Sequence, residues 1–566
     1  MDRRFFLAIA LMVAVVILPS LFIKRPPPTS AAATSGQVVE PPAPSAVVGP
    51  AGSPAVVEDS APPPVAALPA RARADTITVS SSLYRYQFST QGGQLVGATL
   101  INYKSMRPDE PDRAAQILPP ETELLAAAVL VGRDTVRISK WTLSPSARSL
   151  EVTGPSSLTF RGGEGELGVE LTYRFLPDEY RIAVSGRVTG IGPNGGTLLV
   201  GMGPGLRNTE ADSVEHAREL GIVTKASRSE LTHFSKLDVG EPQSLTGPFE
   251  WVAVKSKYFA AALLALDSTR AGHGGIGGTY VVATDQVHRT PEAATIWTSL
   301  PVQASGDFGY ELYLGPMEYP RLQAIGHDFD DINPYGWAWL RPIIRPVAVG
   351  ARWLLVWFHE RLGLAYGLGL ILFGILIRVV LWPLNQRAMR AGMQMQAIQP
   401  ILKELQEKHQ NEPQKLQQEM FKVYKEHNVN PFSGCWPLLL PWPILIALFF
   451  VFQNSIELRG ASFLWLPDLA RPDPLFITPI AMGVSMFAVT KVGQIGLPPN
   501  PQMKVMLYVM PLMMVVLFFK FASGLNLYYA TINIASIPQQ WFVAKERLKT
   551  GGKPAARGAP QRKAKR

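Results

Sequence analysis

One arginine inside an apolar segment is the clearest candidate for chemistry in this chain. Arg378 lies within the apolar run from Leu362 to Pro383, and no other candidate membrane segment contains an acidic residue that would pair with it. A charge at the centre of a bilayer costs about 2.5 to 3.5 kcal/mol, so an unpaired arginine there indicates a water-filled cavity that attracts anionic groups. Arg378 is also close to Pro383, and its long side chain could instead extend to the nearer membrane surface. Both interpretations are open.

A polar stripe in the last apolar segment is the second candidate. Its members recur at intervals of 3, 4, 3 and 4, which places them on one helical face: Asn526, Tyr529, Asn533, Ser536 and Gln540. Polar side chains in hydrocarbon either hydrogen-bond to neighbouring helices or face water, and the stripe alone favours neither. Combined with an unpaired Arg378, it favours a hydrated recess.

Methionines form a third pattern. Met503, Met506, Met510 and Met513 step by 3, 4 and 3 along the fifth apolar segment. The flexible thioether adapts to many apolar shapes, which suits a surface that contacts varied hydrophobic helices. Ordinary helix packing would give the same stripe, so this interpretation also stays open.

Six apolar segments would position these residues in a membrane. They are Leu7 to Ile23, Leu362 to Pro383, Pro437 to Ser455, Leu475 to Thr490, Val505 to Phe519 and Leu525 to Val543. Lys and Arg are concentrated in residues 385–430 and in the tail 544–566, which places both regions, together with the N-terminus, in the cytoplasm. We expect residues 1–23 to be a retained anchor, with a cleaved signal peptide as the alternative.

The first loop is large enough to form an exported domain. Residues 24–74 are rich in Pro and Ala and predict a flexible linker. Apolar residues then alternate with period 2, as in Leu83 to Phe88 and Val169 to Phe175, and Pro177 to Glu179 would turn the second of these strands into a hairpin. We expect residues 75–335 to form an antiparallel β-sandwich of two sheets with a C-terminal helix, loosely connected to the membrane core. With Cys435 as the single cysteine, the domain has no disulfide.

Two further segments flank the second span. Residues 336–361 contain alternating Trp and Arg that suit an amphipathic helix in the headgroup layer, although a packed helix of the soluble domain is the alternative: Trp337, Trp339, Trp353, Trp357, Arg341, Arg345 and Arg352. Residues 385–430 predict a basic helical hairpin, with a helix break and new helix start at Asn411 to Pro413. The hairpin is either a docking element or a solvated spacer that fixes topology.

Four stretches of the chain resemble the YidC/Oxa family of membrane protein insertases. They are IRVVLWPLNQ, HNVNPFSGCWPLLLPWPILIALF, SIELRGASFLWLPDLARPDPLFITPIAMG and FASGLNLYYATIN. Their order and spacing match from about Gly336 to Lys549, and the anchor with an exported β domain is similar to the Gram-negative branch. The resemblance implies a multi-pass α-helical membrane protein with six spans, a five-span insertase core over residues 362–543, and a periplasmic β-sandwich.

The resemblance also implies site residues. Arg378 would be the groove arginine and Tyr529 a groove residue that contacts substrate. By their spacing, Asn526, Asn533 and Gln540 of the polar stripe would line the same groove. Two positions depart from the family pattern. Gly374 stands where a small polar residue is frequent, and Pro441 where the third span often has a polar residue.

An insertase of this kind would work without a cofactor or a metal. A recess with a positive charge shortens the apolar barrier for the acidic tail of a nascent membrane protein. The substrate helix would then slide into lipid along apolar residues of the third and fifth spans: Leu445, Met506, Met510 and Met513. Such a protein acts in the bacterial inner membrane, alone or with the Sec translocon. The hairpin and the basic tail would contact ribosomes or targeting factors, with attraction to anionic lipid as the alternative role of the tail.

Two other function classes stay open from the residues alone. A secondary transporter or channel would also use an intramembrane arginine, but such proteins tend to have inverted repeats and intramembrane acids, and the sequence has neither. A membrane enzyme would need His, Cys, Asp or Glu gathered near one leaflet, and His359 is the one histidine next to a span.

Overall fold

The computed structural model describes residues 75–549 apart from 121, 123, 133, 266–274, 288–289, 337–338, 387–388, 390–397, 410–411, 428–441 and 498–500. The chain divides into a unit Met1–Arg71 and a unit Ala72–Arg566, and the described residues belong to the second. The predicted anchor and linker, the part of the basic tail after residue 549, and Cys435 and Pro441 lie outside the described residues.

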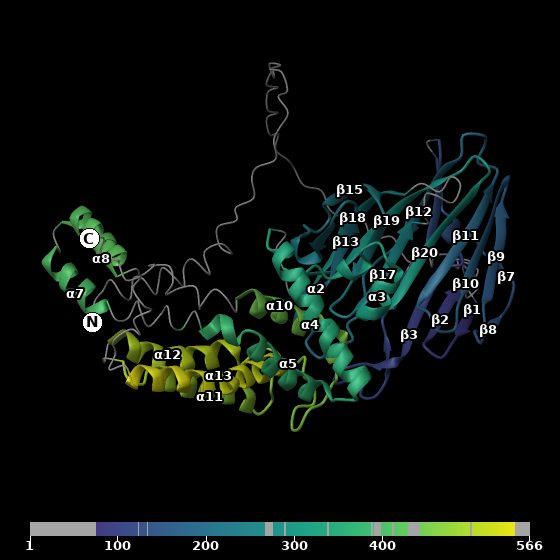
Figure 1. Ribbon diagram of the computed structural model, residues 1–566. Helices are drawn as coiled ribbons and strands as arrows, with labels where there is room; N and C mark the ends of the chain where they lie inside the picture. Colours follow the sequence, from purple (N-terminus) through teal and green to yellow (C-terminus); the bar gives the residue numbers. More distant parts are fainter. Residues whose placement is uncertain are drawn as a thin grey trace, which may run out of the picture. The chain divides into compact units, whose positions relative to one another are not determined.

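The first half of the described chain forms three β-sheets (Figure 1). The five-stranded sheet has the order β4-β3-β2-β1-β8, with β1 Thr76–Ser80, β2 Tyr84–Ser89, β3 Leu95–Lys104, β4 Ala114–Gln116 and β8 Ser149–Glu151. The six-stranded sheet has the order β15-β18-β19-β12-β5-β6, with β5 Ala127–Val131, β6 Asp134–Val136, β12 Gly196–Gly201, β15 Pro242–Phe249, β18 Ile276–Val287 and β19 Thr290–Val302.

The nine-stranded sheet is the largest. Its order is β14-β13-β16-β17-β20-β11-β10-β9-β7, and its strands are β7 Ser144–Pro145, β9 Ser156–Glu164, β10 Leu167–Phe175, β11 Arg181–Thr189, β13 Gly221–Lys225, β14 Ser229–His233, β16 Trp251–Lys255, β17 Phe259–Ala265 and β20 Asp307–Pro316. Among the described strands, β1 and β8 form the one parallel pair.

Alternating residues build the core of this β domain as the sequence predicts. Tyr84, Tyr86 and Phe88 are fully buried on one face of β2, and the rings of Tyr84 and Tyr86 stack with centroids 4.0 Å apart. The predicted hairpin is confirmed, because β10 pairs antiparallel with β11 across the turn at 176–180. One hydrophobic cluster joins all three sheets. The expected two-sheet sandwich is therefore wrong in its number of sheets, since period-2 burial identifies a strand's inner face but not its sheet.

Helices make up most of the rest. They are α2 Ser213–Glu219, α3 Tyr319–Ile325, α4 Arg341–Leu362, α5 Tyr366–Val380, α7 Gln399–Lys408, α8 Pro413–Glu426, α10 Trp442–Asn454, α11 Ile477–Gly493, α12 Pro501–Phe518 and α13 Ser523–Lys549. Short 3-10 turns are η1 Ile138–Lys140, η2 Phe234–Lys236, η3 Phe329–Ile332 and η5 Ile456–Leu458. The five predicted spans after the first coincide, in order, with α5, α10, α11, α12 and α13. Within the described ranges, no helix is both long and apolar enough to cross a membrane, and the six-span count stays a prediction.

The helices α7 and α8 lie within the predicted hairpin. They pack through three buried residues, Ile398, Leu402 and Val423. Pro413 begins α8, as its fixed φ favours. The long polar faces of both helices carry most of their charged residues, which keeps the shared buried surface small.

The direction of the helices alternates along the chain. The ring of Phe487 in α11 lies 5.8 Å from that of Tyr508 in α12, and the Gln494 side chain donates to the Met503 carbonyl at 3.0 Å. Higher residue numbers in α11 thus meet lower numbers in α12, so the two helices are antiparallel. A chain that passes back and forth through one layer produces this alternation.

One prediction about the segment 336–361 is wrong, and the error concerns a residue of α4. Trp353 and Trp357 are exposed, with 57% and 38% of their surface accessible, as expected for side chains in a headgroup layer. Arg352 was predicted to face the same layer, but only 5% of it is exposed. Its guanidinium points into the protein, because Glu457 provides a buried partner there.

A buried histidine in α2 predicts acid sensitivity of the β domain. His216 is 3% exposed, its Nε2 lies 3.2 Å from the Leu206 carbonyl oxygen, and burial lowers its pKa to about 4. The unfolded chain therefore takes up a proton below pH 6.5 that the folded domain takes up only near pH 4. Stability should fall between these values by up to roughly 3 kcal/mol and then level off.

Urea unfolding of the full chain at pH 7.0 and 4.5, followed by hydrogen exchange in β13, measures this effect. His216→Met should flatten the pH dependence by about one proton equivalent. His359→Met removes an exposed histidine and serves as the control. An unchanged slope in His216→Met would show that other groups cause the acid sensitivity.

Candidate functional site: the contact between α5 and α13

A parallel contact between α5 and α13 positions the predicted groove residues. Gly374 faces Thr531, where a Cβ on the glycine would lie 3.2 Å from the threonine methyl group. At one end of the contact Leu370 lies against Gly524, and at the other the Gln539 side chain donates to the Trp382 carbonyl at 3.0 Å. Residue numbers rise together on both helices, so α5 and α13 run in the same direction (Figure 1).

Arg378 lies on the α13-facing side of α5. Gly374, Arg378 and Trp382 are spaced by four residues and so share one helical face, and both neighbours of Arg378 contact α13. The guanidinium therefore lies at the level between Thr531 and Gln539. Its Nε is buried and has no hydrogen-bond partner among the described residues, and the side chain as a whole is half-exposed.

Other polar atoms of α13 are also buried without a partner. Among the described residues, the Oδ1 atom of Asn526, the hydroxyl of Tyr529 and the Oε1 atom of Gln539 accept or donate no hydrogen bond. An unpaired buried polar group costs about 1 to 3 kcal/mol, and proteins usually meet that cost with ordered water. The region around α5 and α13 therefore has the polar atoms that internal water would need.

The predicted stripe on α13 divides between different neighbours. Asn533 donates to the Ser485 hydroxyl of α11 at 3.2 Å, and Gln540 lies against Gly493 of the same helix. The ring of Tyr529 contacts Phe518 of α12 with centroids 5.4 Å apart. The interhelical interpretation thus holds for Asn533 and also for Asn526, whose side-chain nitrogen donates to the Phe518 carbonyl of α12 at 3.1 Å. The Oδ1 atom of Asn526 and the hydroxyl of Tyr529 have no partner among the described residues.

The stripe prediction missed two residues that face α5. Thr531 contacts Gly374, and Gln539 bonds to Trp382 and also lies 3.3 Å from the Oε1 atom of Gln386. The spacing of Tyr528, Thr531 and Gln539 would have revealed a second face, because Gln539 and Gln540 are adjacent and point about 100° apart.

The predicted apolar surface is not continuous in the structure. Met506 and Met513 of α12 are exposed, with 53% and 41% of their surface accessible, and Met510 is half-buried. Leu445 belongs to α10 and lines a cavity of about 770 Å³ that also contacts the β domain. The structure therefore does not bring Leu445 together with the methionines.

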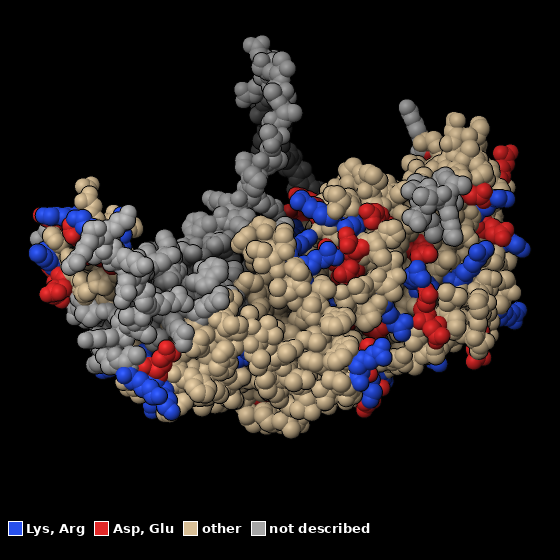
Figure 2. Space-filling view, viewed as in Figure 1, with Lys and Arg blue, Asp and Glu red and all other residues tan. Residues whose placement is uncertain are grey.

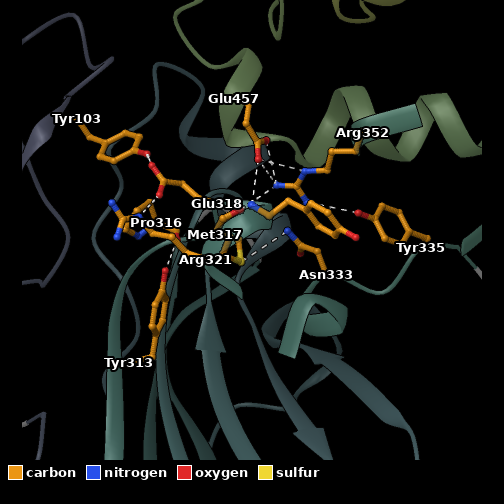
Figure 3. Close-up of polar contacts among 11 residues, drawn as sticks. Tyr103, Tyr313, Pro316, Met317, Glu318, Arg321, Asn333, Tyr335, Arg352 and Glu457 are labelled. Carbon is orange, nitrogen blue, oxygen red and sulfur yellow. Dashed lines mark hydrogen bonds and ion pairs between the residues drawn. The ribbon is translucent and has the colours of Figure 1, made fainter. Parts of the chain in front are cut away.

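A buried ion pair connects α4, the β domain and the loop after α10 (Figure 3). The Nη2 atom of Arg352 lies 2.8 and 2.9 Å from the two carboxylate oxygens of Glu457 and also donates to the Met317 carbonyl at 2.9 Å. The Tyr319 amide donates to the same carboxylate. Burial opposes the charge of Arg352, but the carboxylate and the Tyr335 hydroxyl outweigh burial and raise the pKa of the guanidinium.

A second buried arginine binds the same loop to the β domain. Arg459 donates to the Glu210 carboxylate at 2.8 Å and to the Thr209 carbonyl at 3.2 Å. Its guanidinium lies over the rings of Tyr258 and Phe259, 5.7 and 5.4 Å from their centroids. The expectation that few constraints connect the exported domain to the core is therefore wrong for this loop.

The residues described give no indication of metal chemistry: within those ranges, no group of three or more His, Cys, Asp and Glu side chains could hold a metal ion. The prediction that no cofactor is needed stays a prediction. The site at α5 and α13 consists of an arginine, amides, hydroxyls and apolar side chains, which can bind and hydrate a polypeptide.

Comparison with known proteins shows the family to which the chain belongs. Residues 76–348 match the YidC periplasmic domain, and residues 357–550 match the 60Kd inner membrane protein family. The membrane protein insertase YidC of Chlorobaculum tepidum is 31% identical over 528 residues, which cover 85% of this chain and 86% of that protein. The chain belongs to the YidC family of membrane protein insertases.

Other YidC proteins extend the comparison. The membrane protein insertase YidC of Paraburkholderia phymatum is 30% identical over 487 residues and covers 84% of both chains. A crystal structure of an active YidC insertase, with its first transmembrane domain resolved, is 17% identical and covers 84% of this chain and 93% of that chain, with a TM-score of 0.34. The antiparallel β region thus corresponds to the periplasmic domain of the YidC family, and the C-terminal helices to its inner membrane part.

The pair of Arg352 and Glu457 predicts an unequal response to single and double substitutions. Glu457→Leu leaves a buried guanidinium without a counter-ion and should destabilise the protein by about 3 to 5 kcal/mol. Adding Arg352→Met removes the uncompensated charge, so the double variant should recover part of the lost stability. Melting temperatures, measured on the full chain in detergent, give the order of stability of the unchanged protein, Glu457→Leu and the double variant.

The exposed pair of Arg161 and Glu170 serves as the control, because exposed pairs contribute little. Equal melting temperatures for Glu457→Leu and the double variant would show that the buried charge does not determine stability at this junction.

Proposed function

We propose that this protein inserts nascent membrane proteins into the bacterial inner membrane through a hydrated groove between α5 and the other core helices. The groove contains Arg378 and opens toward the cytoplasm. Acidic or polar tails of the substrate enter it, bind near the guanidinium, and cross half of the bilayer instead of all of it. The N- and C-termini are cytoplasmic and the β domain is periplasmic.

The observation that carries the proposal is the set of unpaired buried polar atoms on facing helices. Arg378 Nε and Gln539 Oε1 lack protein partners among the described residues and lie about one helical turn apart along the parallel contact. Helices in a dry bilayer would pair such groups with each other or avoid them. Water at this contact would form hydrogen bonds with both atoms. The positive charge of Arg378 would attract carboxylates into the hydrated contact.

The surface of the helices supports a membrane location. Figure 2 shows few Lys, Arg, Asp or Glu side chains over α5, α11 and α13 on the face drawn, whereas such side chains are frequent over the β domain and around α7 and α8. In the proposed path the substrate helix leaves the groove beside α12. Exposed Met506 and Met513 fit apolar helices of different shapes, and burial in lipid provides about 25 cal/mol per Å² of apolar surface.

The hairpin of α7 and α8 has the features of a docking element. Its hydrophobic contact consists of three buried residues and three partly buried ones, Leu405, Met420 and Tyr424, so the pair can shift at modest cost. Gln386 at the start of the hairpin segment lies beside Gln539, so a shift of the hairpin would reach the groove. We include ribosomes or targeting factors as its partners and the Sec translocon as a second partner of the core.

Substitution of Arg378 tests the groove directly. Arg378→Lys keeps the charge and should retain most insertion, whereas Arg378→Ala should reduce insertion of substrates with acidic tails roughly tenfold, since about 1.4 kcal/mol of attraction is lost. Insertion of a single-span substrate into vesicles that contain only this protein provides the measurement. Lys520→Ala removes an exposed cation at the end of α12 and should have no effect.

Cysteine accessibility checks the water in the groove independently. In a Cys435→Ser background, cysteines at Tyr529 and Gln539 should react with a water-soluble thiol reagent added on the cytoplasmic side. A cysteine at Leu448, which is fully buried among apolar residues, should stay unreactive. If the two groove cysteines also fail to react, the site is dry and the proposed mechanism is incorrect.

Replacement of α7 and α8 tests the hairpin. A chain in which Gln399 to Glu426 become a short Gly/Ser loop should keep its fold and its contact at Gln386, but should lose insertion because nothing docks or moves at the groove mouth. Lys415→Gln with Lys422→Gln removes charge and keeps the helices, so it separates docking from topology. Normal insertion by the loop variant would identify the hairpin as a spacer.

A further inference from the structure

A cavity of about 770 Å³ lies where α10 meets the β domain. Its two walls differ in chemistry. One wall comes from the β domain and the start of α4 and contains basic groups, among them Lys236, Lys255, His233 and Arg341. The other wall comes from α10 and is apolar at Leu445, Ile446, Phe449 and Phe450 and polar at Gln453 and Asn454.

The basic wall carries more positive than negative charge. Glu219 is the one acidic residue that lines the cavity, and it lies 3.3 Å from the buried Nζ of Lys255, which also donates to the Asn333 side chain at 2.6 Å. Lys255 and Glu219 therefore neutralise each other. Lys236 is exposed and forms no ion pair within the part of the chain that the structure describes, and Arg341 donates only to the Ser229 carbonyl there.

Two buried nitrogen atoms of this wall lack a partner among the described residues. They are Nε of Arg341 and Nδ1 of His233. Burial and the nearby charge of Lys255 lower the pKa of His233, whereas a hydrogen bond to the Arg218 backbone raises it. That bond uses the donor of the neutral ring, so Arg341 Nε and the exposed ammonium group of Lys236 are the donors left for an anion. Such a pair suits the oxygen atoms of a phosphate.

The apolar part of the α10 wall is shorter than one leaflet. Leu445 and Phe450 are five positions apart, about 7.5 Å along the axis, and the polar residues Gln453 and Asn454 follow them in the lining. This is about half of the roughly 15 Å of hydrocarbon in one leaflet, so the wall fits a segment of an acyl chain. Phe518 and Leu525 extend this apolar surface. The cavity thus combines an anion site with a groove for an acyl chain.

We propose that this cavity binds one anionic glycerophospholipid of the outer leaflet, with its phosphate at Lys236 and Arg341 and an acyl chain along α10. The inference rests on the proposed function in one respect, namely that α10 crosses the outer leaflet below the periplasmic domain. A polypeptide is a poorer occupant, because its main-chain N–H and C=O groups would face phenylalanine side chains without partners. An acyl chain has no such groups.

The lipid would occupy the junction that holds the β domain on the helices. Asn333, which binds Lys255, also contacts Met317, and the Met317 carbonyl accepts a hydrogen bond from Arg352 (Figure 3). One chain of contacts therefore runs from the cavity to the buried ion pair with Glu457.

Photolabelling with a defined lipid tests the proposal. The full chain is reconstituted into phosphatidylcholine nanodiscs with phosphatidylglycerol that carries a diazirine on one acyl chain, and labelled peptides are identified by mass spectrometry. Labels should fall on α10, within Trp442–Asn454. Unlabelled phosphatidylglycerol should compete, whereas phosphatidylcholine and inorganic phosphate should not.

Photolabelling of α10 is compared in three variants. Lys236→Glu should reduce labelling of α10 at least fivefold, because the substitution reverses the charge at the phosphate. Lys140→Glu makes the same change at an exposed lysine away from the cavity and should label normally. Ile446→Trp fills the acyl groove without a change of charge and should also reduce labelling, so the two halves of the site are tested separately.

Several outcomes would overturn the lipid site. Equal labelling of Lys236→Glu and the unchanged chain would exclude a phosphate at this wall, and competition by phosphatidylcholine would exclude selection of an anion. Competition by inorganic phosphate would identify a soluble anion as the ligand, and cross-links from α10 to an inserting substrate would identify a polypeptide. Failure of the proposed function would appear differently, as normal insertion by Arg378→Ala, because lipid labelling requires no insertion.

Discussion

The need of buried polar groups for a partner determines how this protein is arranged. Three arginines illustrate it. Arg352 and Arg459 are buried beside Glu457 and Glu210, and each of them also bonds to a carbonyl oxygen of the β domain. Arg378 has no such partner among the described residues. The two paired arginines connect the β domain to the helices, and the unpaired one would be available to water and substrate in the function proposed above.

The paired arginines also explain why the junction is specific. A buried charge that loses its counter-ion destabilises the fold by several kcal/mol. Any arrangement that separates Glu457 from Arg352 is therefore strongly disfavoured. Hydrophobic contact alone would allow the loop after α10 to slide over the β domain. Two ion pairs, Arg352 with Glu457 and Arg459 with Glu210, fix the position of this loop. They thereby also fix the ends of α10 and α11 that the loop connects.

Sequence patterns predicted the helices and strands better than they predicted which of them contact one another. The alternation around Tyr84 and Tyr86 predicted a strand and its buried face, and the apolar runs predicted α5 and α10 to α13. The sheet count and the direction of Arg352 were not predictable, because both depend on residues far away in the chain: Glu457 is 105 positions from Arg352. Period and composition describe one element at a time, whereas an ion pair depends on two.

The same limit applies to the candidate site. The stripe from Asn526 to Gln540 was correctly placed on one face of α13, but sequence could not say which helix that face meets. Asn533 meets α11 and is satisfied there, while Gln539 on the neighbouring face meets α5 and keeps an unpaired oxygen. Water would therefore hydrate α13 mainly on the side of α5 and near Tyr529. In the proposed mechanism, a groove with one hydrated wall and one sealed wall would guide a polar tail along Arg378 without opening a pore through the helices.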